Sequence, residues 1–374
     1  MRTYLDHNAG APMRAEALSA MAEVLGTAGN PSSAHREGAR ARALLETARA
    51  RVAALIGARP AEIVFTSGAT EANNLALRGT TWKHIVVAAT EHASVLETAR
   101  AIAPDAITVI RVDDDGRVSA DHVIRACGAD AVLASVGLAN GEVGAVAPIA
   151  AIATGLTGRA TLLHTDAAQA AGRIPVDVHA LGIDLLSLSS HKLGGPAGVG
   201  ALWVRPGTAL VPQATGGPQE RGLRAGTENI AAVVGFGVAA EMARAELDVV
   251  PQHLAALIDR LWDGIRARVP DVVRNGPSSG TRLPNTLNVR FPGCAGESLL
   301  VLLDLAGIAV SLGSACAAGA AEPSHVLVAM GQDRDAARSA IRLSIGPSTT
   351  DGCIAHVLDT LPAAVAQVRG RSAA

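Results

Sequence analysis

Lys192 is the residue whose type and setting point most directly to chemistry. It follows the apolar run 185–189, where the β-like pattern stops and two glycines and a proline forbid a simple continuation as helix or strand. Of the 32 basic residues, only Lys83 and Lys192 are lysines. A guanidinium does not give up a proton, whereas a desolvated lysine amine can become neutral and form a Schiff base with a carbonyl. Composition alone leaves this interpretation and that of an ordinary surface lysine equally open.

Polar side chains also follow other apolar runs that the pattern predicts as strands. The small-residue turn 66–71 opens a predicted helix, which is how backbone N–H groups and a hydroxyl are offered to a phosphate. Helix capping explains its hydroxyls equally well. Ligands of an open parallel sheet bind outside the carboxyl ends of its strands, so these ends should line one rim. The other ends carry Thr90, Glu91 and His92, then Asn140, then Asp166 and Gln169, and finally Ser189, His191 and Lys192.

A phosphate cradle, a planar residue, a carboxylate and a lysine together match the needs of pyridoxal 5'-phosphate (PLP). This cofactor requires a lysine for its aldehyde and an acid that keeps the pyridine nitrogen protonated, so that the ring can act as an electron sink. Lys192 and Asp166 would supply them, and His92 can stack over the ring and relay protons. Taken singly, Asp166 would be read as a helix cap and His92 as a structural histidine.

The apolar pattern predicts an α/β protein with a seven-stranded, mostly parallel sheet in a large domain. Several strands are unbroken apolar runs, typical of strands covered on both faces. The gap 190–200 is too short for a crossover, so the last strand should be antiparallel to its neighbour. Helices are expected at 15–25, 37–56, 95–103 and 167–180. Strands are expected at 63–66, 85–89, 107–112, 131–136, 162–165, 185–189 and 201–204.

A second, smaller α+β domain is indicated from about residue 249, where the alternation changes. The predicted division is a large domain at 12–248 and a small domain formed by 1–11 and 249–374. The small domain should contain helices at 252–269, 297–306 and 353–368 and strands at 286–290, 308–311 and 341–344.

Charge and cysteine usage exclude several classes of protein. The net charge is −2 with both signs interspersed, so neither nucleic acid nor a membrane surface is an expected partner. No apolar run is long enough for a membrane span and no signal segment is seen, which predicts a cytoplasmic protein. A clustered set of arginines fits the wet face of one helix: Arg36, Arg40, Arg42, Arg49 and Arg51. The cysteines have no metal-ligand spacing, which predicts free thiols and no intrinsic metal site: Cys127, Cys294, Cys316 and Cys353.

Ordered motifs run through nearly the whole chain. They are Tyr4-Leu5-Asp6, Asn30-Pro31-Ser32-Ser33 with His35 and Gly38, Phe65-Thr66-Ser67-Gly68-Ala69-Thr70-Glu71, Glu91-His92, His164-Thr165-Asp166-Ala167-Ala168-Gln169, Ser190-His191-Lys192, Gln219-Glu220-Arg221 and Gly226-Thr227-Glu228-Asn229. This set resembles the cysteine desulfurases of the class V aminotransferase group. The resemblance implies a PLP-dependent homodimer of fold type I.

The resemblance also implies roles for individual residues. Lys192 would hold the cofactor, Asp166 would pair with the pyridine nitrogen and Gln169 would bond the ring hydroxyl. The phosphate and the rest of the cofactor would be bound by Ala69, Thr70, His92, Asn140, Ser189, Ser190 and His191, with Thr227 reaching across from the other subunit. Asn140 and Arg342 would hold the substrate carboxylate, for which the arginine fork is suited.

Cys316 decides which reaction follows. It lies in the small-residue stretch 313–319, whose composition argues against the buried, inert setting usual for cysteine. The resemblance makes Cys316 the carrier of a persulfide: L-cysteine gives L-alanine, and the sulfur passes to an acceptor such as an iron–sulfur scaffold, whose cluster Cys316 could transiently ligate. Because a free thiol has a pKa of about 8.5, local help, for instance from His92, is expected.

Some positions depart from the family pattern, and other functions remain open. Gly10, Gly141, Ala197 and Leu312 replace the usual residues, and of these Gly141 would loosen the carboxylate site and Leu312 would stiffen the cysteine loop. One alternative is another reaction on the same cofactor, such as that of a selenocysteine lyase or an aminotransferase. Another is a non-catalytic binding protein on the same fold, which would be colourless.

Overall fold

Seven strands form one twisted sheet in the computed structural model, which describes residues 2–128, 132–312 and 322–370. The spatial order is β2-β8-β7-β6-β5-β3-β4. Strands β4, β3, β5, β6 and β7 pair in parallel, and β8 is antiparallel to both β7 and β2. The predicted sheet and its antiparallel strand are therefore confirmed. The bounds are β2 Ile63–Thr66, β3 His84–Ala88, β4 Ile107–Ile110, β5 Val132–Ser135, β6 Thr161–Asp166, β7 Leu185–Ser189 and β8 Gly200–Val204.

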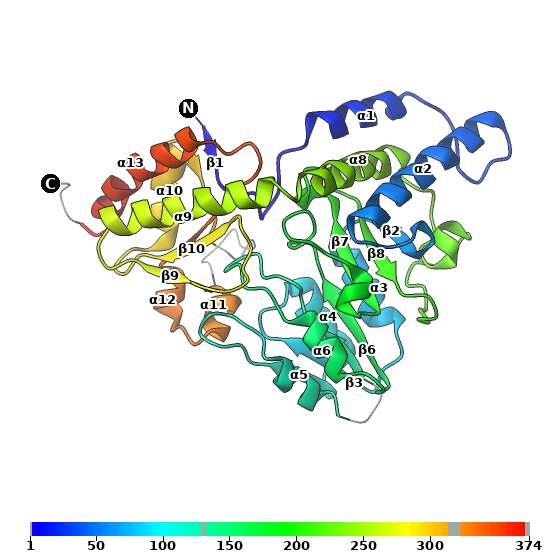
Figure 1. Ribbon diagram of the computed structural model, residues 1–374, viewed down its shortest axis with the longest axis horizontal. Coiled ribbons are helices and arrows are strands. Elements are labelled where there is room, and N and C mark those ends of the chain that lie inside the picture. Colours follow the sequence, from blue (N-terminus) through cyan, green and yellow to red (C-terminus); the bar gives the residue numbers. More distant parts are fainter. Residues whose placement is uncertain (1, 129–131, 313–321, 371–374) are drawn as a thin grey trace.

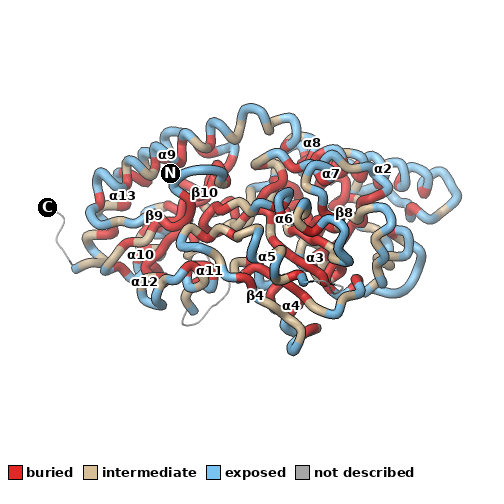
Figure 2. Tube along the Cα trace, turned by 60° about the horizontal axis from the view of Figure 1, so that its bottom comes forward, coloured by how far each residue is buried: buried red, intermediate tan, exposed pale blue. Residues whose placement is uncertain are grey.

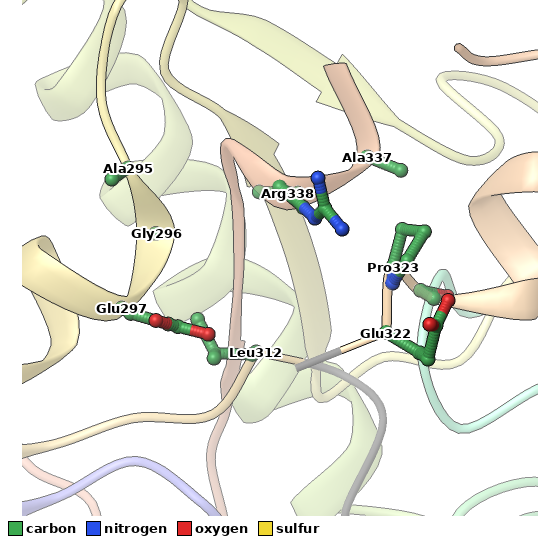
Figure 3. A pocket seen from close by; sticks show the side chains of 10 residues that line it. Ala295, Gly296, Glu297, Leu312, Glu322, Pro323, Ala337 and Arg338 are labelled. Atoms are coloured by element: carbon green, nitrogen blue, oxygen red, sulfur yellow. The ribbon is translucent and has the colours of Figure 1, made fainter. Parts of the chain in front are cut away.

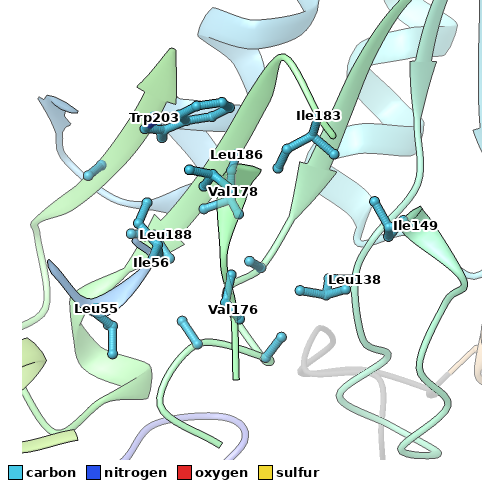
Figure 4. Packing of buried hydrophobic residues seen from close by; sticks show 14 of the residues in the cluster. Leu55, Ile56, Leu138, Ile149, Val176, Val178, Ile183, Leu186, Leu188 and Trp203 are labelled. Carbon is cyan, nitrogen blue, oxygen red and sulfur yellow. The ribbon is translucent and has the colours of Figure 1, made fainter. Parts of the chain in front are cut away.

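Helices cover both faces of this sheet, which is why its central strands carry no polar alternation. On β7, Leu186 and Leu188 pack in one buried cluster with Trp203 (Figure 4), whereas Leu185 belongs to the cluster on the other face. The first cluster is closed by α2, α6 and α8 and the second by α3 and α4. Figure 2 shows the sheet as a buried centre beneath partly exposed helices. The helices of this part are α1 Ala15–Leu25, α2 Arg36–Leu55, α3 Ala69–Gly79, α4 Ala93–Ile102, α5 Ala120–Ala126, α6 Ile149–Gly155, α7 Val178–Leu181 and α8 Ile230–Glu246, with short 3-10 helices η1 Pro60–Glu62, η2 Ser190–Lys192 and η3 Gln219–Gly222.

The predicted helix over 167–180 is wrong, because only α7 is helical there. After β6 the chain forms tight turns, in which the N–H groups of Ala170 and Ala171 donate to the carbonyl of Ala167. Gly172 then adopts φ +72°, and Pro175 lacks the N–H that a helix would need. The alanine-rich composition favours helix, but these two residues end it before one can form.

A separate hydrophobic cluster and two smaller sheets are formed mainly by the C-terminal part. Strand β10 pairs antiparallel with β12 and β9, while β1 pairs in parallel with β11. The N-terminus therefore lies beside the C-terminal elements, as Figure 1 shows. We propose that the chain divides into 12–248 and 1–11 with 249–374, which these two clusters support. The remaining bounds are β1 Thr3–Tyr4, β9 Val273–Asn275, β10 Thr286–Arg290, β11 Ile308–Ala309, β12 Ala340–Ser344, α9 Val250–Arg268, α10 Gly296–Leu305, α11 His325–Ala329, α12 Arg334–Arg338 and α13 Asp351–Val368.

Arg49 does not lie on a wet face of α2, so the predicted solvated arginine cluster is wrong at this position. Its residue exposure is 4%, and its Nη1 and Nη2 lie 2.7 and 2.8 Å from the two carboxylate oxygens of Glu220. The guanidinium also stacks over the ring of Phe65 at 4.7 Å. Helical spacing places position 49 on the side of α2 that packs against the sheet, where only a paired charge is tolerated.

None of the helices within residues 2–128, 132–312 and 322–370 is long and apolar enough to cross a membrane.

Candidate active site

The carboxyl ends of β2, β6 and β7 meet at one edge of the large sheet. Asp166 is the last residue of β6, Ser189 is the last residue of β7, and Lys192 ends the 3-10 turn that follows it. Because β8 runs in the opposite direction, its first residue, Gly200, lies at the same edge and pairs with both Thr66 and Ser189. The structure thus brings the predicted strand-end residues to a common rim.

Lys192 is not a solvated surface lysine. Its Nζ donates hydrogen bonds to the backbone carbonyls of Asn8 at 2.6 Å and Ala9 at 2.8 Å. Burial, assisted by the nearby guanidinium groups of Arg173 and Arg342, lowers the pKa of Lys192 to about 8. An amine with this pKa is about one-tenth neutral at pH 7, compared with about four parts in ten thousand for an ordinary lysine.

Asp166 is held in one orientation by hydrogen bonds to both of its oxygens. Its Oδ1 accepts from the N–H of Ala168 at 2.9 Å, and its Oδ2 accepts from Nδ2 of the fully buried Asn73 at 2.8 Å. The same Nδ2 also donates to Ser94 Oγ at 2.8 Å, and that hydroxyl lies 2.7 Å from Nδ1 of His92. A continuous polar chain therefore connects the carboxylate with the histidine.

His92 caps a helix through one ring nitrogen, and its other ring nitrogen is available for proton transfer. It is the N-cap of α4, where its Nδ1 accepts from the N–H of Ser94 at 3.1 Å. Its residue is exposed, and Nε2 makes no hydrogen bond to any residue that the structure describes. Capping uses Nδ1, so it leaves Nε2 for proton relay and the face of the ring for stacking.

The predicted phosphate cradle combines an uncapped helix start with small residues. Gly68 is the N-cap of α3, no side chain caps that helix, and Ala69 and Thr70 form its first turn. Ser189 and Ser190 are buried, and Ser189 Oγ lies 2.9 Å from Nδ1 of His191. The Oγ of Ser190 has no hydrogen-bond partner among the described residues.

Asn140 and Gln169 are both tied to backbone groups. Asn140 Oδ1 accepts from the N–H groups of Glu142 at 2.8 Å and Val143 at 3.0 Å, and its Nδ2 donates to the carbonyl of Thr90 at 3.1 Å. Asn140 therefore fastens two strand-end turns together. Gln169 Nε2 donates to the carbonyl of Asn8 at 3.0 Å.

Arg342 reaches the rim from the C-terminal part of the chain. It lies on β12 with 4% exposure, and its Nη2 is 2.6 Å from Oδ1 of Asp6. Its Nη1 donates to the carbonyl of Gly141 at 3.4 Å. A guanidinium in this position can present its fork to a carboxylate while Asp6 fixes its orientation.

For two predicted site residues, the described part of the chain shows no hydrogen bond to the residues at the rim. Thr227 is exposed in the segment before α8, and none of the hydrogen bonds between described residues connects it to Lys192 or Asp166. Cys316 lies outside the described residues.

A cavity of about 360 Å³ lies where the chain enters and leaves the segment 313–321. Leu312 and Pro323 line it together with the start of α10 and the end of α12 (Figure 3). A Cβ built on Gly296 would lie 2.6 Å from the carbonyl oxygen of Arg338 and 3.1 Å from the Leu312 side chain, so the glycine permits the close approach of both. Lys192, Asp166 and His92 are not among the lining residues.

Sequence reasoning assigned no role to several residues of the site, all of them buried except the half-buried Asp6: Asp6, Asn8, Asn73, Glu91 and Arg173. Burial raises the pKa of the fully buried Glu91 carboxyl to about 8, and its Oε1 accepts from the N–H of Gly137 at 2.7 Å. Asp6 and Glu91 lie inside quoted motifs, so a signal for them existed. The others act through contacts that only the fold creates.

Comparisons with known proteins decide the family. Residues 3–356 match the aminotransferase class-V family. This chain belongs to the class-V aminotransferases. An IscS-like cysteine desulfurase of Mycobacterium tuberculosis is 42% identical to it, over 98% of this chain and 97% of that protein. A cysteine desulfurase IscS 1 of Archaeoglobus fulgidus is 40% identical, over 99% of this chain and 98% of that protein.

Solved structures agree with this assignment. A NifS-like protein superposes on this class-V aminotransferase with a TM-score of 0.90 at 35% identity, covering 97% of this chain and 98% of the other. A NifS-like protein from Rickettsia africae gives a TM-score of 0.89 at 30% identity, covering 99% and 100%. The resemblance to the cysteine desulfurases and the fold type are confirmed.

The residues at the rim fit the cofactor of the family, which is PLP. Lys192 is a desolvated amine, Asp166 is a carboxylate oriented by Asn73, and α3 begins without a side-chain cap. The buried polar atoms Ser190 Oγ and Asn73 Oδ1 have no partner among the described residues, as expected for a site built around a further polar group. PLP is thus the cofactor of this class-V aminotransferase.

Gly200→Ala is expected to weaken PLP binding by about tenfold to a hundredfold, the equivalent of about 1–3 kcal/mol of overpacking. A Cβ at position 200 would lie 2.6 Å from backbone atoms of Gly68 and 2.5 Å from the carbonyl of Leu188, so the cradle must shift. Titration of the cofactor-free protein with PLP, followed by absorbance, measures the effect. Gly26→Ala is the control, because nothing lies within 4 Å of a Cβ there. An unchanged dissociation constant for Gly200→Ala would contradict the assigned phosphate site.

Proposed function

We propose that this class-V aminotransferase is a PLP-dependent cysteine desulfurase, which transfers the sulfur of L-cysteine to Cys316 and releases L-alanine. The names of its full-length relatives support this proposal. The observation that carries it is the desolvated Lys192 amine, held at the same rim as Asp166 and within the electrostatic reach of Arg342.

Binding and proton transfer follow from the side chains at the rim. When bound, PLP supplies an electron sink for charge that develops at the substrate α-carbon. Arg342 holds the substrate carboxylate through its fork, while Asp6 keeps the guanidinium in place. The neutral Nζ of Lys192 accepts the α-proton and later returns a proton, a role for which a pKa near the working pH is best suited. Nε2 of His92 is the second nitrogen that can move a proton.

The sulfur step needs no external oxidant or reductant. The carbon–sulfur bond of cysteine breaks and a sulfur–sulfur bond forms to Cys316, so cysteine and a thiol give alanine and a persulfide. The attacking group is the thiolate of Cys316, and the thiol proton balances the new carbon–hydrogen bond of alanine.

The partners are proposed on the same basis. The protein acts as a homodimer in which Thr227 completes the phosphate site of the other subunit, and the exposed Leu18 and Leu25 on α1 support such an interface. Cys316 delivers its sulfur to an acceptor such as an iron–sulfur scaffold. The free thiols of Cys127, Cys294 and Cys353 suit the reducing cytoplasm, where we place the reaction.

The test is to give L-cysteine and a reductant to the purified protein and to measure alanine and sulfide together. We expect equal amounts of both from a yellow protein that borohydride bleaches. Cys316→Ala should lower alanine formation by at least about tenfold, because the acceptor of the sulfur is lost. Cys353→Ala, which removes a half-buried free thiol, is the control. A Cys316→Ala protein that releases alanine at the full rate would assign a different reaction to the same cofactor.

A further inference from the structure

Arg173 is a buried cation without an acidic partner. Its exposure is 8%, and it forms no ion pair with any carboxylate in the described part of the chain. Burial lowers the pKa of its guanidinium to about 10. Burying an unpaired charge costs free energy, so this residue does not serve stability alone.

The hydrogen bonds of Arg173 go to two residues of the active site. Its Nη1 donates to the carbonyl of Gln169 at 2.9 Å and also to the Oε1 of the same residue. Its Nη2 donates to the carbonyl of Lys192 at 3.5 Å. Arg173 therefore contacts both the residue expected at the ring hydroxyl and the residue expected at the aldehyde.

The contact with Gln169 determines the orientation of its side-chain amide, that is, which position holds the oxygen and which holds the NH2 group. Arginine can only donate, so the amide atom facing Arg173 must be the oxygen, and the NH2 group must point away from it. That NH2 group donates to the carbonyl of Asn8 at 3.0 Å. A Cβ on Gly141 would lie 2.6 Å from Cδ of Gln169, so the glycine gives the side chain room in this position.

The charge of Arg173 is the less compensated of the two guanidinium charges acting on Lys192. Arg173 and Arg342 lower the pKa of that amine, while Asp6 and Asp166 raise it. Arg342 is paired with Asp6 at 2.6 Å. Burial lowers the pKa values of His7 and His191 to about 4. The Arg173 guanidinium contributes to both shifts, after the charge of Lys192 in the case of His191.

We propose that Arg173 is a positioning residue of the active site: it locks the Gln169 amide with its NH2 group available to the ring hydroxyl of PLP, and it places an unneutralised positive charge beside Lys192. This inference rests on the proposed function, because it assigns Arg173 a purpose through Gln169 and Lys192. The charge keeps a larger share of the Lys192 amine neutral at physiological pH. The lock orients the Gln169 NH2 group, which donates one N–H to the carbonyl of Asn8 and has a second N–H for the ring hydroxyl.

The presence of only two lysines permits a direct test of the charge effect without any turnover. The full-length, cofactor-free protein is labelled with acetic anhydride at a series of pH values, and mass spectrometry follows the peptides of Lys192 and Lys83. In the wild type, Lys192 should reach half of its maximal reactivity near pH 8 and the exposed Lys83 near its ordinary value of about 10.4. Arg173→Gln should raise the Lys192 midpoint by about one pH unit and leave that of Lys83 unchanged.

Two further variants separate charge from structure. Arg173→Lys keeps a positive charge, so it should restore the Lys192 midpoint. Arg205→Gln removes an arginine paired with Asp184 at the opposite edge of the sheet and should leave the midpoint where it is. An unchanged Lys192 midpoint in folded Arg173→Gln, or a shift that Arg173→Lys does not reverse, would overturn the charge effect.

The amide lock is tested with PLP itself. Arg173→Gln and Gln169→Ala should each raise the dissociation constant for PLP. The double variant should have the same dissociation constant as Gln169→Ala alone, because Arg173 affects PLP binding through Gln169. If the losses of PLP-binding free energy in the two single variants added up in the double variant, the lock would be overturned. None of these measurements uses cysteine, so a protein that passes them but makes no alanine would refute the proposed function and leave the role of Arg173 intact.

Discussion

Lys192→Ala is expected to lower the rate of alanine formation from cysteine by at least about a thousandfold. A positioned general base contributes about 10² to 10⁴ to the rate, and the same residue is also proposed to anchor the cofactor. No other lysine can replace it, because Lys83, the only other one, is exposed and directly precedes β3, at the opposite end of that strand from the rim. Alanine formation under saturating cysteine and PLP measures the loss.

Two variants accompany this prediction. Lys83→Ala should retain the wild-type rate. Lys192→Arg can still donate to the carbonyls of Asn8 and Ala9, so it should fold normally, yet it should be as inactive as the alanine variant because its guanidinium does not deprotonate. A Lys192→Arg protein with more than about a tenth of the normal rate would rule out proton transfer by this residue.

Glu220→Gln is expected to lower the free energy of unfolding by about 3–5 kcal/mol, because it removes the buried countercharge of Arg49. The guanidinium then keeps only Glu46, a 54% exposed carboxylate whose Oε1 lies 3.1 Å from Nε of Arg49. The Glu220 carboxylate also accepts from the N–H of Phe65 at 2.8 Å, so the pair fixes both α2 and the edge strand β2. Urea unfolding followed by circular dichroism measures the change.

An exposed ion pair provides the matched control. Glu97 and Arg100 lie 2.6 Å apart on α4, but their side chains are 66% and 55% exposed. Glu97→Gln should therefore cost less than about 1 kcal/mol. If Glu220→Gln lowered the free energy of unfolding by as little as Glu97→Gln, the buried pair would not be required for stability.

The local sequence pattern was sufficient to predict helices and strands wherever a segment determines its own structure. The runs 63–66 and 185–189 and the helix 15–25 were predicted with their observed bounds, because apolar runs and breakers coincide there. The segment 167–180 failed since alanine content favours helix, whereas Gly172 and Pro175 dictate turns. Arg49 could not be told from its helical neighbours, because its partner Glu220 lies 171 residues away.

In the candidate site, too, residues at predictable strand ends were identified from the sequence, whereas residues placed by long-range contacts were not. Asp166, Lys192 and His92 were found because parallel strands deliver their last residues to one edge. Asn73 and Arg173 were not, because an asparagine and an arginine on or near helices are ordinary until the fold places them against a carboxylate or a lysine. The roles of the predicted cofactor and substrate contacts remain predictions.

The pair formed by Asp6 and Arg342 joins residues that are 336 positions apart in the chain. During synthesis, this ion pair therefore cannot form until nearly all of the polypeptide has left the ribosome. All strands of the large sheet lie before residue 205, so they leave the ribosome well before β12 brings Arg342 to Asp6. A prematurely terminated chain lacking that last strand would contain every strand of the large sheet but not Arg342, the residue proposed to hold the substrate carboxylate.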